Sequence, residues 1–278
     1  MSPLAYSRTG TGEPLVLLHG VGMSRQAWDP VLPALAASFD VIAVDLPGFG
    51  ESSAMALPPE LAPAAIAAAV GELLDELGVT SPHLAGNSLG GWTALELAAR
   101  RPAASVTLLS PAGLWRKDTP LYCRVSLQAS RWLAHRLGRP LARLVSWRLG
   151  RILVLGQTHG RPGRLSPDTA RRAIRDMATS PGFAPGLRAT ARIRYVGHAP
   201  IGCPVTLAFG SRDWLLRPRQ SRQLEELPGH TRLATLAGCG HVPMSDDPAA
   251  VVGLIEASVK RALSARPPTP GAGVRSGR

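Results

Sequence analysis

Hydrophobic and polar residues follow two different periods along this chain. Short, almost uninterrupted apolar runs have the length of β-strands that are buried on both faces. Between them lie longer segments in which apolar residues recur at the spacing of an amphipathic helix. We expect strands at residues 4–7, 14–18, 40–44, 82–85, 105–109, 204–209 and 231–236, and helices near residues 25–37, 60–77, 88–101, 218–227 and 248–263. This alternation predicts an α/β fold, with a mostly parallel sheet and helices on both of its faces.

The alternation stops for a long stretch in the middle of the chain. Basic amphipathic segments take the place of strands there, at residues 121–137, 140–155 and 166–179. The last of them begins with Ser166-Pro167-Asp168, a typical helix start. We therefore expect an all-helical insertion within one core, followed by a disordered basic tail rich in Pro, Gly and Arg. The predicted divisions are residues 1–113 and 201–265 for the core, 114–200 for the insertion and 266–278 for the tail.

The charge of the chain is concentrated in that insertion. Residues 114–200 carry 17 basic and 3 acidic side chains, a net charge of +14, whereas the remainder carries 14 and 16, a net charge of −2. Three explanations stay open. The arginines could form a solvated helical face, attract an anionic substrate, or contact an anionic membrane surface with Trp132 and Trp147 at its boundary. No nucleic-acid-binding motif accompanies them, so no nucleic-acid partner is expected.

A Gly-x-Ser-x-Gly pattern stands between a predicted strand and a predicted helix, at Gly86-Asn87-Ser88-Leu89-Gly90. In that context the pattern predicts a nucleophile elbow, a tight turn that exposes the serine hydroxyl at the edge of the sheet. The next helix then directs its first N–H groups toward the group that Ser88 attacks. Ser88 is therefore the candidate nucleophile.

A serine nucleophile needs a histidine base and a carboxylate that orients the histidine. His241 follows a predicted strand and the flexible Gly238-Cys239-Gly240, at the strand end where ligands bind in parallel sheets. Asp213 follows the strand predicted at residues 204–209 and is the candidate acid. Asp246 and Asp247 are interpreted as caps of the final helix. We expect surface or satisfied core positions for the histidines at 83, 135, 159, 198 and 230.

The order Ser88, Asp213, His241 is typical of the α/β-hydrolase superfamily, which this chain resembles from about residue 5 to residue 263. Beside the elbow, the resemblance rests on Leu15-Val16-Leu17-Leu18-His19-Gly20-Val21-Gly22, Asp45-Leu46-Pro47-Gly48-Phe49-Gly50-Glu51-Ser52 and Gly238-Cys239-Gly240-His241-Val242-Pro243. It implies the serine-nucleophile branch, esterase-like or lipase-like, in which the helical insertion forms a lid over the pocket.

The same resemblance implies an oxyanion hole built from backbone N–H groups. We assign the donors to Leu89 and Val21, with Gly22 as the alternate for the second. Gly22 and Asn87 are also expected to contribute to substrate binding. His19 is interpreted as a structural residue that supports the loop.

These residues predict a serine hydrolase that cleaves a carboxylic ester or related acyl bond through an acyl-enzyme, with no metal and no organic cofactor. Relatives that attack with an aspartate, such as epoxide hydrolases, are set aside because Ser88 occupies the elbow. The alternative within the fold is a carbon–carbon bond hydrolase of the meta-cleavage type, although Val242 stands where that family typically has Trp. A non-catalytic binding protein is a further alternative, but such members usually lose triad residues.

The cysteines and the amino-terminal residues indicate the cellular compartment in which the protein is expected. The three cysteines, at 123, 203 and 239, are an odd number without metal-ligand spacing, as expected for reduced thiols. No signal-peptide pattern is visible at the start of the sequence. The apolar stretch at 141–155 is interrupted by three arginines, which argues against a membrane span. We expect a cytoplasmic enzyme whose partner is a small acyl substrate, with the open possibility that it is anionic.

Overall fold

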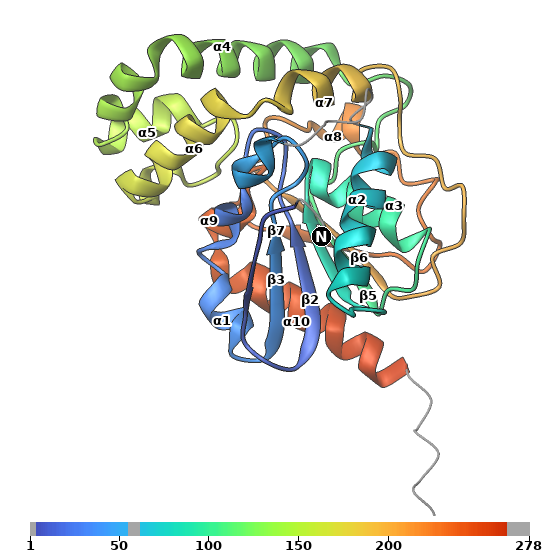
Figure 1. Ribbon diagram of the computed structural model, residues 1–278. Coiled ribbons are helices and arrows are strands. Elements are labelled where there is room, and N and C mark those ends of the chain that lie inside the picture. The colour runs from blue at the N-terminus through green and yellow to red at the C-terminus, as the bar shows by residue number, and fades with distance from the viewer. Residues whose placement is uncertain (1–3, 55–61, 266–278) are drawn as a thin grey trace, which may run out of the picture.

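The computed structural model describes residues 4–54 and 62–265 and contains a seven-stranded sheet (Figure 1). The strands lie in the order β1-β3-β2-β4-β5-β6-β7, and only β1 runs antiparallel to its neighbour. Their bounds are Tyr6–Thr9 (β1), Glu13–Leu18 (β2), Phe39–Val44 (β3), His83–Asn87 (β4), Ser105–Leu109 (β5), Val205–Gly210 (β6) and Arg232–Leu236 (β7). The predicted mostly parallel α/β fold is confirmed, and the first strand begins two residues later than expected.

Alternate residues of the strands pack into two separate apolar clusters, because successive side chains of a strand point to opposite faces. In β2, Val16 and Leu18 belong to the cluster that includes Ile66 and Trp92. Leu15 and Leu17 belong to the other cluster, on the opposite face. The helices α2 (Pro63–Glu76) and α3 (Leu89–Ala98) therefore cover one face, and α1 (Leu32–Ala36) and α10 (Pro248–Ala265) cover the other (Figure 1).

Two of the predicted core helices differ from expectation. The segment 25–37 is divided into a 3₁₀ helix η1 (Arg25–Trp28) and α1. Pro30 lies between the two, and Pro33 lies in the first turn of α1. Proline lacks the N–H that a continuous helix needs. The helix predicted at 218–227 is only α8 (Pro218–Ser221), because Arg222 leaves helical geometry and the Gln223 N–H donates to the Leu114 carbonyl.

Between β5 and β6 the chain forms only helices, which lie over one end of the sheet (Figure 1). They are α4 (Leu121–Leu144), α5 (Arg148–Leu155), the 3₁₀ helix η3 (Pro162–Arg164), α6 (Pro167–Thr179) and α7 (Phe183–Thr190). We call residues 114–200 the helical insertion. α4 continues past Pro140 through a kink at Leu137, and α7 was not predicted. The predicted tail, residues 266–278, lies outside the described residues.

The two ends of the helical insertion are bonded to each other where they leave the core. The Trp115 Nε1–H donates to the Ile193 carbonyl at 2.6 Å, and the Thr119 hydroxyl donates to the Thr190 carbonyl at 2.8 Å. These contacts close the insertion into a single unit above the sheet.

Candidate active site

Ser88 lies in the turn between β4 and α3 with a backbone conformation (φ 54°, ψ −115°) that non-glycine residues rarely adopt. The flanking glycines make this turn possible. A Cβ on Gly86 would lie 2.3 Å from the Gly90 carbonyl oxygen, and one on Gly90 would lie 2.2 Å from the Leu18 carbonyl oxygen. Both contacts are with backbone atoms, which cannot move aside cheaply. The turn therefore has the geometry of a nucleophile elbow.

Asp213 and His241 come together from the ends of β6 and β7. The His241 Nδ1 lies 3.0 Å from the Asp213 Oδ2, and both side chains are buried. The Leu215 and Leu216 N–H groups donate to the other carboxylate oxygen at 3.0 and 2.8 Å. Burial raises the pKa of Asp213, but the histidine and these hydrogen bonds outweigh it, so the pKa is lowered. The ionised carboxylate can thus orient the ring and leave Nε2 as the proton acceptor.

Asn87 holds the backbone of the candidate base. Its side-chain amide donates to the His241 carbonyl at 2.8 Å and to the Leu109 carbonyl at 2.9 Å. The side chain is fully buried and stands outside the residues that line the pocket. These contacts give Asn87 a positioning role, and its contribution to substrate binding stays a prediction.

Asp246 links the loop of His241 to the helical insertion. Its carboxylate accepts hydrogen bonds from the N–H groups of Gly160, Arg161 and Gly240 at 2.7, 2.8 and 2.7 Å. The interpretation of Asp246 as a helix cap is wrong, whereas Asp247 does cap α10 through the Ala250 N–H. A backbone bond from Val242 to Thr158 adds to this connection. The insertion thus holds the loop that carries the candidate base His241.

The loop after β2 runs directly beside Ser88. A Cβ on Gly20 would lie 3.2 Å from the Ser88 Cβ, and Val21 lines the same pocket as Ser88. Leu89 is the first residue of α3, so its N–H has no partner within the helix. Gly22 also lines the pocket with a positive φ of 70°, and a Cβ there would lie 2.8 Å from the Met177 Sδ. The oxyanion donors stay a prediction that this proximity supports.

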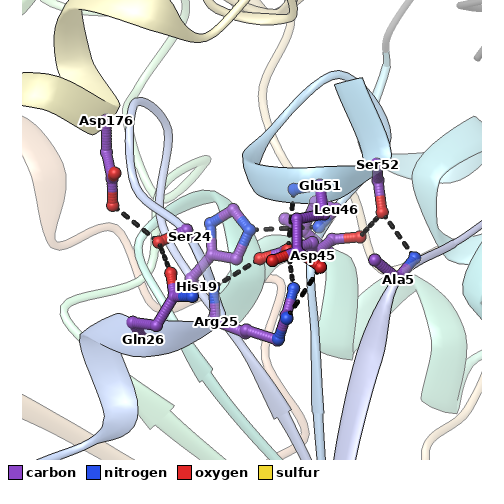
Figure 2. A network of polar contacts seen from close by, with 10 residues as sticks. All are labelled: Ala5, His19, Ser24, Arg25, Gln26, Asp45, Leu46, Glu51, Ser52 and Asp176. Carbon is purple, nitrogen blue, oxygen red and sulfur yellow. Dashed lines mark hydrogen bonds and ion pairs between the residues drawn. The ribbon is translucent and has the colours of Figure 1, made fainter. Parts of the chain in front are cut away.

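A buried polar network fixes the shape of this loop (Figure 2). The Leu46 N–H donates to the His19 Nε2 at 3.0 Å, so the Nδ1 carries the proton and donates to the Gly20 carbonyl at 2.8 Å. Burial lowers the pKa of His19, and the ring stays neutral. Asp45 accepts from the Arg25 N–H at 2.6 Å on the far side of the loop. The structural role predicted for His19 agrees with these contacts.

A cavity of about 600 Å³ contains Ser88 and His241 and lies between the core and the helical insertion. Most of its wall is apolar. The apolar lining comes from Val21, Met23, Leu127, Leu133, Ala134, Leu141, Leu153, Val154, Leu155, Ile174, Met177, Leu215 and Val242. His159 also lines it, although no local sequence pattern distinguished this histidine from the others. Burial lowers the pKa of His159, which favours its neutral form.

The charged residues that line this cavity are mainly acidic. Asp29, Asp168 and Asp176 line it, and the single arginine among the described lining residues, Arg172, is paired with Asp29. The Ser24 hydroxyl donates to the Asp176 Oδ2 at 2.6 Å (Figure 2). Burial raises the pKa of Asp176 despite this bond and two nearby arginines. Because Asp29 and Asp168 are each paired with an arginine, the pocket does not share the basic excess of the helical insertion.

Five of the seventeen lysine and arginine side chains of the helical insertion line a second, more open groove between α4 and α6. The basic side chains that line it are those of Arg131, His135, Arg136, Arg139, Arg171 and Arg175. Neither Ser88 nor His241 borders this groove. The expectation that the arginines attract an anionic substrate to the triad therefore gains no support from their positions.

Comparisons with known proteins agree with this architecture. The sequence profile of the alpha/beta hydrolase fold matches residues 13–248. The chain is 34% identical over 203 residues to the epoxide hydrolase EphH of Mycobacterium tuberculosis, covering 67% of this chain and 90% of that protein. It is 29% identical over 261 residues to a pimeloyl-(acyl-carrier protein) methyl ester esterase of Aeromonas hydrophila, covering 91% and 98%. A thermophilic esterase from Thermogutta terrifontis shares the fold, with a TM-score of 0.74 over 93% of each chain at 22% identity.

Proposed function

Because this chain belongs to the α/β-hydrolase fold family, we propose that it is a serine hydrolase that cleaves carboxylic esters with apolar, uncharged substituents. The observation that carries the proposal is the position of Ser88 and His241 in one apolar cavity, with Asp213 bonded to the His241 Nδ1. The related methyl ester esterase supports ester cleavage as the reaction.

Acylation begins when the Ser88 Oγ attacks the ester carbonyl carbon and His241 accepts the hydroxyl proton at Nε2. The Asp213 carboxylate stabilises the resulting imidazolium. The carbonyl oxygen becomes an oxyanion that the Val21 and Leu89 N–H groups bind; each such donor lowers the barrier by about 3 kcal/mol. The intermediate collapses when the C–O bond breaks and His241 returns the proton to the alcohol.

Deacylation repeats these steps with water as the nucleophile. His241 removes a proton from water, the hydroxide attacks the acyl carbon, and the bond to Ser88 breaks as the serine regains its proton. The products are a carboxylic acid and an alcohol. The helical insertion acts as the lid of the pocket and shapes the space for the substituents of the ester.

The charges of the pocket favour a neutral substrate. Asp29 is paired with Arg172 and Asp168 with Arg171, so no unpaired cation among the described lining residues is available to hold a carboxylate, and the buried Asp176 offers it no attraction. The apolar wall provides contact for an aliphatic or aromatic substituent. The same charges weaken the alternative of a carbon–carbon bond hydrolase, which needs a cationic group to hold the carboxylate of its substrate.

Epoxide opening is the activity in the name of one relative. In the aspartate-nucleophile members of the fold, that reaction forms an ester between the substrate and a carboxylate at the elbow. Ser88 occupies that position here. We therefore favour acyl transfer for this chain.

The first test measures initial rates on p-nitrophenyl esters of increasing acyl length. Ser88→Ala should lower kcat by at least about 10⁴-fold, because the residual rate comes only from binding and the oxyanion hole. Ser245→Ala is the matched control, since Ser245 lines the same pocket outside the triad. Undiminished turnover by Ser88→Ala would contradict the proposed nucleophile.

A second test compares two esters of equal length, one with a terminal methyl group and one with a terminal carboxylate. The neutral ester should be preferred by about tenfold or more in kcat/KM, because the carboxylate would be buried without a partner. A preference for the acidic ester that disappears in Arg172→Gln would contradict the proposed substrate class.

A further inference from the structure

Helix α5 buries Leu155 but leaves several of its other apolar residues exposed. Leu149 and Leu153 are one helical turn apart and are 65% and 71% exposed, and Ile152 beside them is also exposed. Trp147, immediately before the helix, is 74% exposed. A surface helix normally places such a stripe against the core. Here Trp147, Leu149 and Leu153 instead remain mostly exposed in the described part of the chain.

The exposed apolar side chains are concentrated on α4 and α5. Eleven of the seventeen large, exposed apolar residues among the described residues lie between positions 121 and 153. Trp132 on α4 is 58% exposed, and Leu133 beside it is exposed as well. Scattered exposed leucines are ordinary, whereas a concentration of this kind marks an interaction surface.

Arginines lie among these apolar side chains. Arg136, Arg139 and Arg143 on α4 and Arg148 on α5 are exposed. The ion pairs found among the described residues include none of these four, whereas Arg171 and Arg172 on α6 are each paired with an aspartate. The combined surface is apolar and cationic, which is the composition of segments that lie on anionic lipid surfaces.

The exposed apolar surface continues into the catalytic pocket. Leu133 and Leu153 are both exposed, and both line the cavity that contains Ser88. An apolar molecule could therefore pass from a lipid surface to the pocket without leaving an apolar environment.

We propose that the helical insertion docks on the surface of an anionic lipid bilayer. Trp132, Trp147 and Leu149 enter the headgroup region, and the four exposed arginines contact lipid phosphates. No helix in the described ranges is long and apolar enough to cross a membrane, so the contact is peripheral. A second copy of the chain fits the surface less well, because it would bring two insertions of net charge +14 together.

The test measures co-sedimentation with vesicles of phosphatidylcholine alone or with about 30% phosphatidylglycerol. The full chain with Ser88→Ala is used so that no lipid is hydrolysed, and the result does not depend on the proposed esterase activity. We expect binding to the anionic vesicles that weakens with salt, and much weaker binding to the neutral ones. Equal binding to both, or binding to neither, would overturn the proposal.

Surface variants then locate the contact. The combined change Arg136→Gln, Arg139→Gln, Arg143→Gln and Arg148→Gln should weaken binding by about 10²-fold or more. The double variant Trp147→Ser with Leu149→Ser should also weaken binding to the vesicles, because it removes apolar surface that would be buried in the headgroup region. Arg232→Gln with Leu233→Ser on β7 is the matched control, because it removes the same types of exposed side chain elsewhere.

Two results would contradict this location of the contact. One is binding to anionic vesicles that is unchanged in both sets of insertion variants, with thermal unfolding confirming that they are folded. The other is a dimer by analytical ultracentrifugation that Trp147→Ser with Leu149→Ser dissociates, without vesicle binding; it would assign the surface to a second copy.

Discussion

The turns around Ser88, Asp213 and His241 and the outer helix α4 of the helical insertion differ in how closely backbone atoms approach their glycines. In the core, a Cβ on Gly86, Gly90 or Gly210 would lie within 2.3 Å of a backbone oxygen. In the insertion, a Cβ on Gly138 would meet nothing within 4 Å. Gly160 resembles the core glycines, because a Cβ there would lie 2.2 Å from the Gly238 carbonyl oxygen. Close backbone packing thus surrounds Ser88, Asp213 and His241, and within the insertion it recurs at Gly150, where a Cβ would lie 1.9 Å from the Leu144 carbonyl oxygen.

The same two regions differ in charge and exposure. The core is nearly neutral and buries its central strands on both faces, whereas the edge strands β1 and β7 are largely exposed. The insertion carries the excess charge and leaves large apolar side chains exposed. We infer that the core determines the rate of the chemical step and that the insertion determines which molecules reach it.

The largest effect is expected in the core, at the candidate acid. Asp213→Asn should lower kcat by about 10⁴-fold, because an amide favours the wrong histidine tautomer. Initial rates on a short p-nitrophenyl ester would measure this loss of kcat. Asp246→Asn is the comparison, and it should lower the melting temperature more than kcat, since Asp246 bonds three backbone N–H groups. The reverse pattern would mean that Asp246 is the acid.

A pair of alanine substitutions tests the contrast in backbone packing. Gly90→Ala should destabilise the protein by more than about 3 kcal/mol, because the new Cβ would overlap the Leu18 carbonyl. Gly138→Ala should be neutral or stabilise by up to about 1 kcal/mol, as for glycine inside a helix. Urea denaturation of both variants would measure the two changes in the free energy of unfolding. Equal losses of stability would remove the distinction between the regions.

A smaller effect is expected in the insertion, on specificity. Met177→Ala would enlarge the pocket beside Gly22. It should shift the preferred acyl length upward and change the ratio of kcat/KM for long and short esters by about tenfold, since each methylene contributes 1 to 3 kcal/mol in such pockets. The acyl-length series measures this shift. If the preferred acyl length stayed the same and kcat fell, Met177 would affect the chemical step and not the choice of substrate.

The smallest effect is expected at the contact between α6 and the loop after β2. Burial raises the pKa of Asp176, so its contribution to stability is present below the unfolded-state pKa and lost as the pH rises through the folded-state pKa. Asp176→Asn should therefore be more stable than wild type near neutral pH and lose this advantage near pH 4, with a difference under about 1 kcal/mol. Denaturation at both pH values measures it, with Asp118→Asn as control, because Asp118 is exposed and belongs to none of the ion pairs found among the described residues.

The elements that the sequence predicted are those whose signals are local. Apolar runs of strand length located β2 through β7, and the elbow pattern together with the strand ends brought Ser88, Asp213 and His241 to one place. The residues lie near one another because the parallel sheet puts the carboxyl ends of its strands at one edge, and their catalytic roles stay a prediction.

The remaining features depend on contacts between distant segments. From the sequence, Asp246 is interpreted as a helix cap. Its hydrogen-bond donors in the structure include the N–H groups of Gly160 and Arg161, which lie 85 or more residues away along the chain. The shortening of α8 follows from a bond between Gln223 and Leu114. The position of His159 in the pocket and the direction of the arginines depend on how the helical insertion folds back. None of these partners is visible in a local pattern.

The bonds of Asp246 bear on how this scaffold could be modified. The segment around Thr158 and Gly160 belongs to the helical insertion by position, yet it holds the loop of His241. An insertion exchanged as a whole for that of another hydrolase would remove this support along with the substrate pocket. A chimera that retains residues 158–161 and replaces only the helices on either side would keep the base in position, so the boundary for grafting a new specificity lies inside the insertion.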